Sequence, residues 1–155
     1  MKAVVQLVKN ASVTVEGTVT GAIDSGLLVY LGVAVGDSEK DAEWMADKVS
    51  NLRILGDEQG KMNLSLLDIL KTDENAKTST GVLAISQFTL LGDAAKGRRP
   101  FYGGAAEPDK AKALYEYFIK KIKDHGLVCE AGVFQAHMDV SYTNDGPVTI
   151  LLDSR

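Results

Sequence analysis

The string Ser86-Gln87-Phe88-Thr89 places two hydroxyl side chains at the end of an apolar run. A hydroxyl beside a proton-accepting group can attack an ester carbonyl, so both residues are candidates for nucleophilic chemistry. The string itself contains no histidine or carboxylate that could accept the proton. On an extended strand Ser86 and Thr89 would also point to opposite faces, so only one could line a given pocket unless the strand bends. Because hydroxyl residues in strands are more often structural, both interpretations stay open.

A second string, Asn144-Asp145-Gly146-Pro147-Val148-Thr149, carries a proline where an apolar run begins. Proline removes a donor from a β-ladder and is normally confined to strand starts, edges and bulges. A Gly-Pro step at the start of a strand could therefore point its carbonyl oxygens in a direction that an ordinary strand does not allow. Asparagine and aspartate are also frequent turn residues, and turn chemistry alone favours a plain turn here.

The usual hydrolase and metal motifs are absent from the sequence. It contains no Gly-x-Ser-x-Gly, His-Glu-x-x-His or Cys-x-x-Cys string, and two histidines, His125 and His137, cannot form a three-histidine zinc site. We therefore expect no metal and no cofactor. His125 follows a predicted helix, and its side chain is expected to interact favourably with the C-terminus of that helix. Cys129 is expected to be a buried, inert thiol.

Composition and charge are those of an ordinary globular protein. The chain has 155 residues, 45% hydrophobic and 25% charged, with a net charge of −4. We expect one domain over residues 1–155. No apolar run reaches the roughly 18 residues of a membrane helix, and the first residues do not form a signal peptide, so we expect a cytoplasmic protein without a membrane partner. The negative net charge argues against non-specific nucleic-acid binding, and we expect no DNA partner.

Positive charge is nevertheless concentrated in one place. Lys96, Arg98 and Arg99 lie in a compact loop with Gly97 and Pro100. Five lysines over residues 110–123 are explained by the solvated face of a helix, whereas an arginine pair in a Gly/Pro loop is less easily explained in this way.

Hydrophobic periodicity predicts a mixed α/β fold that starts with strands. Strands are expected over 3–8, 12–15, 19–23, 26–33, 81–91, 127–131, 133–143 and 147–152. Helices are expected over 38–52, with Ser38 and Asp41 forming a capping box, and over 108–124, with Pro108 as the first helical residue. We assign no element to the polar connection 71–80.

Taken together, these strings resemble the D-aminoacyl-tRNA deacylase family, in order and over nearly the whole chain. The Ser-Gln-Phe-Thr and Asn-x-Gly-Pro-Val-Thr strings correspond to its two signatures, and their joint occurrence is highly specific. The other matching strings are Met1-Lys2-Ala3-Val4-Val5-Gln6, Ala11-Ser12-Val13-Thr14-Val15, Gly26-Leu27-Leu28-Val29, Asn51-Leu52-Arg53-Ile54, Gly60-Lys61-Met62-Asn63 and Lys96-Gly97-Arg98-Arg99-Pro100.

The resemblance implies a sheet-rich single domain with two main helices packed on the sheet, layered β/β/α, that forms a homodimer. It implies hydrolysis of the ester that links a D-amino acid, or mischarged glycine, to the 3′ adenosine of tRNA. Gly146 and Pro147 would be a Gly-cisPro motif that one subunit inserts into the active site of the other. Its backbone carbonyls would bind the α-amino group and leave no room for an L side chain, so that selection works by exclusion.

The resemblance also assigns residues to the site. Ser86, Gln87, Phe88 and Thr89 would line the adenosine and ester pocket, with N–H groups near Gln87 and Phe88 facing the developing oxyanion. Thr89 is either a nucleophile or a residue that positions the adenosine. Phe134, Ala136 and Met138 would complete the substrate pocket, whereas Lys96, Arg98 and Arg99 would contact phosphates of the tRNA acceptor end.

Three features depart from the family pattern. Leu7 stands where a basic residue usually follows Val-Gln, Gln135 stands where glycine is usual after Phe134, and the connection 71–80 is longer than in many members. If the basic residue helps to hold the Gly-Pro motif, the rigidity of that motif is in question. His137 occupies a variable position and is interpreted as structural or solvent-facing.

Two other functions compete with the deacylase. A non-catalytic protein that binds nucleic-acid ends would also suit the basic turn and the sparse hydroxyl chemistry. A threonine-dependent esterase acting on small esters without RNA is the third alternative.

Overall fold

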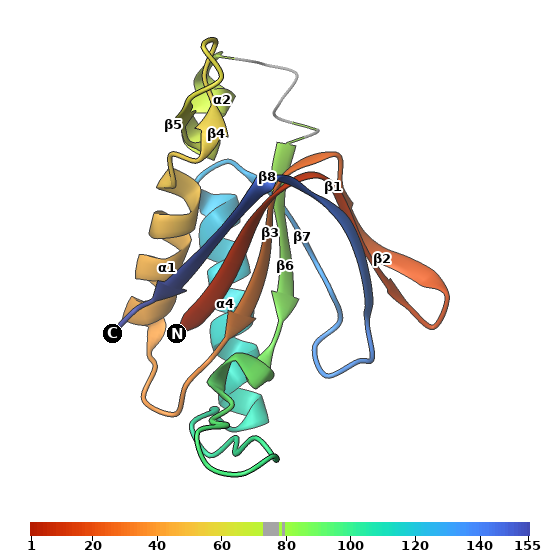
Figure 1. The fold of residues 1–155 in the computed structure, drawn as a ribbon, viewed down its shortest axis with the longest axis vertical. Coiled ribbons are helices and arrows are strands. Elements are labelled where there is room, and N and C mark those ends of the chain that lie inside the picture. The colour runs from red at the N-terminus through yellow and green to blue at the C-terminus, as the bar shows by residue number, and fades with distance from the viewer. Residues whose placement is uncertain (73–77, 79) are drawn as a thin grey trace.

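A curled, mixed β-sheet with helices on one face organises the molecule (Figure 1). The computed structural model describes residues 1–72, 78 and 80–155. The six strands of the main sheet are β1 (Lys2–Val15), β2 (Thr18–Ile23), β3 (Ser25–Gly32), β6 (Thr80–Ser86), β7 (Val128–Ala131) and β8 (Asp139–Asp153). Their order is β2-β1-β3-β6-β7, with β8 paired to β1. β6 runs parallel to β3 and β7, whereas β1 is antiparallel to all of its partners.

The long strand β1 is the axis of the sheet. It pairs with β8 along almost its whole length, while β3 and then β2 occupy its other edge. The sequence predicted two strands, over 3–8 and 12–15, and that division was wrong. Asn10 pairs with Thr143 of β8, so β1 continues past the register shift between Val8 and Asn10.

Two amphipathic helices cover one face of the sheet, as the periodicity predicted. α1 spans Glu39–Asn51, and the Asp41 carboxylate accepts hydrogen bonds from the Ser38 N–H and hydroxyl at 2.9 and 2.8 Å. α4 spans Pro108–Asp124 and begins at its proline. Their buried stripes pack on the sheet and form the larger core with β3 and β6. The buried Met45, Val49, Leu114, Phe118 and Ile122 belong to these stripes.

The sheet curls over its other face and encloses a second core. Val8, Ala11 and Val13 of β1 and Ile23 of β2 pack against β3 and β6 there. The approach of β2 to β7 is so close that a Cβ on Gly21 would lie 2.8 Å from the Ala131 carbonyl oxygen. This curl produces the two strand layers of the predicted β/β/α arrangement.

Three predicted strand boundaries were wrong, and each correction lies near a candidate site residue. β6 ends at Ser86, and residues 88–91 form a 3₁₀ helix, η1 (Phe88–Leu91), instead of continuing the strand. Residues 133–138 form a turn, not a strand. β8 runs through 144–147, where the sequence predicted a turn between two strands.

The segment between α1 and β6 carries smaller elements. β4 (Leu55–Gly56) pairs with β5 (Met62–Leu64), and the short helix α2 (Leu66–Thr72) follows. The sequence did not predict α2, which includes the beginning of the connection 71–80 that was left without an element. Residues 73–77 and 79 of that connection lie outside the described residues.

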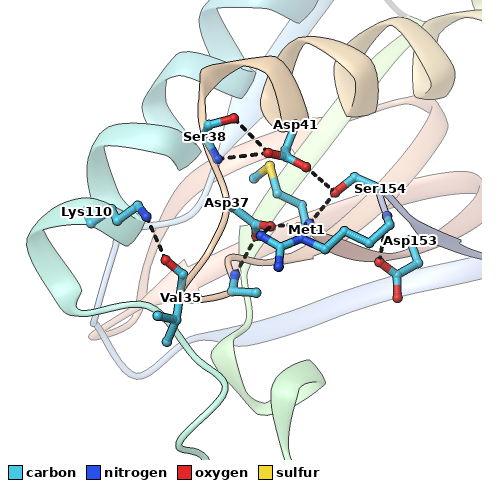
Figure 2. Close-up of polar contacts among 10 residues, drawn as sticks. Met1, Val35, Asp37, Ser38, Asp41, Lys110, Asp153 and Ser154 are labelled. Atoms are coloured by element: carbon cyan, nitrogen blue, oxygen red, sulfur yellow. Dashed lines mark hydrogen bonds and ion pairs between the residues drawn. The ribbon is translucent and has the colours of Figure 1, made fainter.

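Both ends of the chain pack against the loop before α1 (Figure 2). The Met1 ammonium donates to Asp37 Oδ1 at 2.8 Å and to Ser154 Oγ at 2.5 Å, and Arg155 Nη2 lies 3.0 Å from the same Asp37 oxygen. Asp37 also accepts the Ala34 N–H. Because the ammonium and the carboxylate are fully buried, loss of Asp37 would leave the Met1 ammonium as a buried charge without its counter-ion.

Candidate active site

A cavity of about 690 Å³ opens where β6 ends, between the turn 133–138 and the start of α4. Its wall contains residues from β3, β6, the loop before α4, α4, the turn and β8. They are Leu31, Val33, Ile85, Ser86, Gln87, Phe88, Ala105, Ala106, Pro108, Ala111, Tyr115, Phe134, Gln135, Ala136, His137, Met138 and Val140. The size suits a small ligand group with a few polar contacts.

The bend after Ser86 turns the first signature into the cavity wall. The Gln87 N–H donates to the Leu31 carbonyl at 2.8 Å, and the chain then enters η1. Ser86, Gln87 and Phe88 line the cavity, whereas Thr89 is exposed and is not part of its wall. The Gln87 side-chain amide donates to the Thr89 hydroxyl, so the two side chains are linked beside the cavity.

The opposite wall is the turn that contains Phe134, Ala136 and Met138, all predicted site residues. Gln135 holds a left-handed conformation with φ +64°, which explains why glycine is usual at this position. A residue with a side chain at this position therefore has a conformational cost.

Tyr115 of α4 is a wall residue that the sequence analysis did not select. Its hydroxyl donates to the Ala84 carbonyl at 2.7 Å, and its ring lies 6.1 Å from the Phe134 ring. Burial raises the pKa of the Tyr115 hydroxyl above its ordinary value, so the group remains a donor and supports the turn. Its helical spacing with Phe118 and Ile122 marked it only as a core residue, and no chemical signal separated it from them.

The cavity wall is poor in ionisable groups. None of the described residues that form it carries a carboxylate, an ammonium or a guanidinium group. The His137 side chain is 96% exposed and lies 3.9 Å from the Asp139 carboxylate, so it faces solvent at the rim. Cys129 is buried away from this wall, and burial raises the pKa of its thiol to about 12. The ionisable side chains of the described wall are therefore the His137 imidazole at its rim and the Tyr115 hydroxyl.

The basic turn lies close to the rim. Lys96, Arg98 and Arg99 are exposed in the loop between η1 and α4. Phe88 is 58% exposed and contacts Tyr102 of that loop edge-on, at 5.1 Å between ring centroids. An exposed ring can stack on a nucleobase, and cations carried by the same loop can bind phosphates.

Gly146 and Pro147 do not line the cavity of their own chain. Both are exposed on β8, where Gly146 has φ +111° and the Gly146–Pro147 peptide bond is cis. The predicted site residues thus fall into three places: the cavity wall, the loop with the basic turn, and an exposed segment of β8.

Across 1–72, 78 and 80–155, no group of three or more histidine, cysteine, aspartate or glutamate side chains could hold a metal ion. No helix in the described part of the chain has the length and apolar character needed to cross a membrane.

Comparison with known proteins identifies the relatives of this chain. Residues 4–153 match the family described as D-Tyr-tRNA(Tyr) deacylase. The chain is 56% identical over 155 residues to a D-aminoacyl-tRNA deacylase of Koribacter versatilis, a match that covers 100% of this chain and 98% of that protein. The chain belongs to the D-aminoacyl-tRNA deacylase family. It is a hydrolase that acts on the ester bond of aminoacyl-tRNA in tRNA proofreading.

Other relatives of this deacylase also match it over nearly the whole length of both chains. A D-aminoacyl-tRNA deacylase of Thermotoga petrophila is 55% identical over 154 residues and matches 99% of this chain and 97% of its own. A solved structure described as c-Myc DNA Unwinding Element Binding Protein has a TM-score of 0.87 at 39% identity and covers 100% of this chain and 99% of its own. A probable eukaryotic D-amino acid tRNA deacylase shares the fold, with a TM-score of 0.79 at 14% identity over 97% of each chain.

Family membership decides between the functions that the sequence left open. The ester hydrolase acting on tRNA is confirmed, and the non-catalytic binder and the general esterase are not supported. The mixed α/β fold of this family is also confirmed.

Proposed function

We propose that this deacylase releases D-amino acids, and glycine from mischarged tRNA, from the 3′ adenosine of tRNA. It rejects L-aminoacyl esters because Gly146 and Pro147 of a second subunit close the cavity. The observation that carries the proposal is the separation of the two signatures. Ser86-Gln87-Phe88 forms part of the wall of a cavity whose described residues carry no carboxylate, ammonium or guanidinium group, while Gly146 and Pro147 lie exposed outside it.

The apolar side chains that β8 exposes support a homodimer. Leu151 is 77% exposed, and it pairs across the ladder with Val4, which in turn pairs with the half-buried Tyr30. Large apolar side chains on one exposed sheet face favour association, and two copies related by a twofold axis would cover both faces at once. The same association would bring the exposed Gly146 and Pro147 of each subunit toward the other. We take the whole chain, residues 1–155, as one deacylase domain that works in the cytoplasm.

Chirality would then be read by main chain. A backbone carbonyl can accept hydrogen bonds from the substrate α-ammonium group, and a wall placed on the side of the L substituent rejects it by steric clash. Glycine has no side chain to reject and would pass. Clash discriminates strongly because packed backbone cannot move aside at low cost.

Main chain would also stabilise the reaction centre. The Gln87 N–H is occupied by the Leu31 carbonyl, so it is not free for an oxyanion, contrary to the sequence-based prediction for that group. The Phe88 N–H begins η1 and has no acceptor within that helix, which makes it the better candidate donor.

Thr89 acts as a positioning residue in this proposal. Its hydroxyl is bonded to the Gln87 amide and lies outside the cavity wall, and the imidazole among the described wall residues, His137, faces solvent at the rim. A water molecule oriented against the bound ester would instead attack the carbonyl carbon. The bond to the ribose 3′ oxygen breaks, and a proton from the water ends on that oxygen. Lys96, Arg98 and Arg99 would bind phosphates of the acceptor end.

The test compares D-Tyr-tRNA with L-Tyr-tRNA in the presence of the purified protein. Release of D-tyrosine, with L-Tyr-tRNA left intact, supports the proposal. Equal release of both enantiomers would contradict selection by exclusion. A tyrosine ester that lacks adenosine serves as the control, and we expect it to survive because nothing would orient it in the cavity.

A further inference from the structure

β8 departs from its ladder at the second signature. Gln6 of β1 pairs with Thr149, and Val8 pairs with Asn144, so that Leu7 alone faces the residues 145–148 between them. Such a bulge leaves main-chain groups without their ladder partners. Gly146 and Pro147 lie at its centre, and glycine at this point, with φ +111°, adds little stiffness of its own.

The Asn144 side chain closes this bulge. Its amide nitrogen donates to the Leu7 carbonyl at 2.9 Å and to the Val148 carbonyl at 3.0 Å. Both neighbours are acceptors only, so the amide orientation is fixed by the contacts, and both N–H groups are used. One side chain therefore joins the opposite strand to the residue that follows Pro147.

Other side-chain contacts around the bulge contribute less to fixing its conformation. The Lys9 ammonium lies 3.5 Å from the Asp145 carboxylate, but the two side chains are 63% and 44% exposed, and exposed ion pairs contribute little. The Gln6 amide donates to the Thr149 hydroxyl at 3.1 Å at one end of the bulge and does not span it. Asn144 is half-buried and is the side chain that connects both sides.

The contact also bears on the departure at position 7. Asn144 binds the Leu7 carbonyl and not its side chain, so the bond does not depend on the basic residue that is usual there. The bulge of this chain is held by an amide bound to main chain on both sides.

We propose that Asn144 is a positioning residue for chiral selection. By tying Leu7 to Val148 it fixes the direction of the main-chain carbonyls at Gly146 and Pro147. This inference rests on the proposed function of those carbonyls. Asn144 itself does not touch the substrate in this account, and its loss would act through the main chain of the bulge.

The experiment compares Asn144→Ala with a matched control, Asn10→Ala. Asn10 also links β1 to β8 through its side-chain amide, at 3.4 Å from the Thr143 hydroxyl, but it lies outside the bulge. The readout is the ratio of kcat/KM for D-Tyr-tRNA to kcat/KM for L-Tyr-tRNA. We expect Asn144→Ala to lower this ratio about tenfold, the scale of two net hydrogen bonds, and Asn10→Ala to leave it unchanged.

A loss of stability alone would not change that ratio, which separates positioning from folding. Asn144→Ser keeps one donor, and its ratio should fall between those of the wild type and Asn144→Ala. It also provides a second variant if Asn144→Ala does not fold. An unchanged ratio in the folded Asn144 variants, with a wild type that still prefers the D substrate, would overturn this inference and leave the proposed function standing. A wild type without preference would overturn both.

Discussion

The Phe88 ring meets the Tyr102 ring edge-on, with centroids 5.1 Å apart and planes at 66°. This contact joins the first signature to the loop that carries Lys96, Arg98 and Arg99. Asp93 and Phe101 pair across the base of the same loop through two backbone hydrogen bonds of 2.8 Å. The RNA-binding loop of the proposal is therefore held at the rim of the cavity by ring packing on one side and by backbone pairing on the other.

Tyr102→Ala tests whether this contact positions the loop. Edge-to-face pairs contribute about 0.5–1.5 kcal/mol beyond area burial, so we expect KM for D-aminoacyl-tRNA to rise about two- to tenfold with little change in kcat. Steady-state deacylation kinetics measure both constants. Trp44→Ala, which removes an exposed ring from α1, is the control and should leave KM unchanged. A fall in kcat at constant KM would contradict a role in RNA binding.

The arginine pair gives a second expectation, about salt. Each phosphate contact contributes roughly 0.7–0.9 to the slope of log affinity against log salt. We expect Arg98→Ala with Arg99→Ala to weaken tRNA binding and to reduce this slope by about one unit or more. Binding titrations at several salt concentrations measure it. Lys112→Ala, on the exposed face of α4, should change neither value, and an unchanged slope in the double variant would exclude the pair from phosphate binding.

Position 135 tests the conformational cost of departing from the family pattern. Gln135 has φ +64°, a region in which a non-glycine residue costs about 1–2 kcal/mol. We therefore expect Gln135→Gly to raise the free energy of unfolding by about 1 kcal/mol, part of the relief being offset by the greater flexibility of the unfolded chain. Urea denaturation measures the change. Glu16→Gly, at φ 50° in the β1–β2 turn, should have a similar effect, and a loss of stability in both variants would contradict this explanation.

The decline of the unfolding free energy at low pH depends in part on Asp41, which belongs to the cluster drawn in Figure 2. Hydrogen bonds from Ser154 and from Ser38 lower the pKa of Asp41 from 3.8 to about 2. A lowered pKa in the folded state stabilises the protein above the unfolded value, and this contribution is lost as pH falls from about 4 to about 2. We expect Asp41→Asn to flatten the decline in unfolding free energy over that window.

Measurement of the unfolding free energy at several pH values tests this expectation for Asp41. A decline in Asp41→Asn as steep as that of the wild type would show that other carboxylates carry the effect.

Local patterns predicted α1 and α4 well because the signals of these two helices are local. The capping box at Ser38 and Asp41 and the proline at residue 108 mark helix starts without reference to the rest of the fold. The strands needed more information. β1 continues through residues 9–11, and β8 continues past its bulge at 145–148, because the two strands pair with each other on both sides of these irregularities. Pairing between residues so far apart in the sequence is not visible in a local window.

The candidate site could be located from the sequence only in part. The two signatures identified the wall residues Ser86, Gln87 and Phe88, but the bend that excludes Thr89 from the wall depends on a backbone bond from Gln87 to Leu31. Tyr115 was missed because a buried tyrosine at helical spacing is indistinguishable from a core residue. Long-range contacts of this kind become visible only in the folded structure.

The central claim is that one subunit lends main chain to the cavity of the other. Gly146→Ala should disable the lent segment, because a Cβ there would lie 2.6 Å from Val148 Cγ2 and residue 146 has φ +111°. Ala136→Trp should fill the cavity of its own subunit. We expect each variant alone to be inactive on D-Tyr-tRNA.

Mixing the two variants under conditions that exchange subunits is the decisive measurement. A hybrid dimer pairs the open cavity of the Gly146 variant with the intact Gly146 and Pro147 of the Ala136 variant, so release of D-tyrosine should reappear in the mixture. If hybrid dimers form and no D-tyrosine is released, or if the wild-type protein is a monomer that still distinguishes the two enantiomers, the account is contradicted.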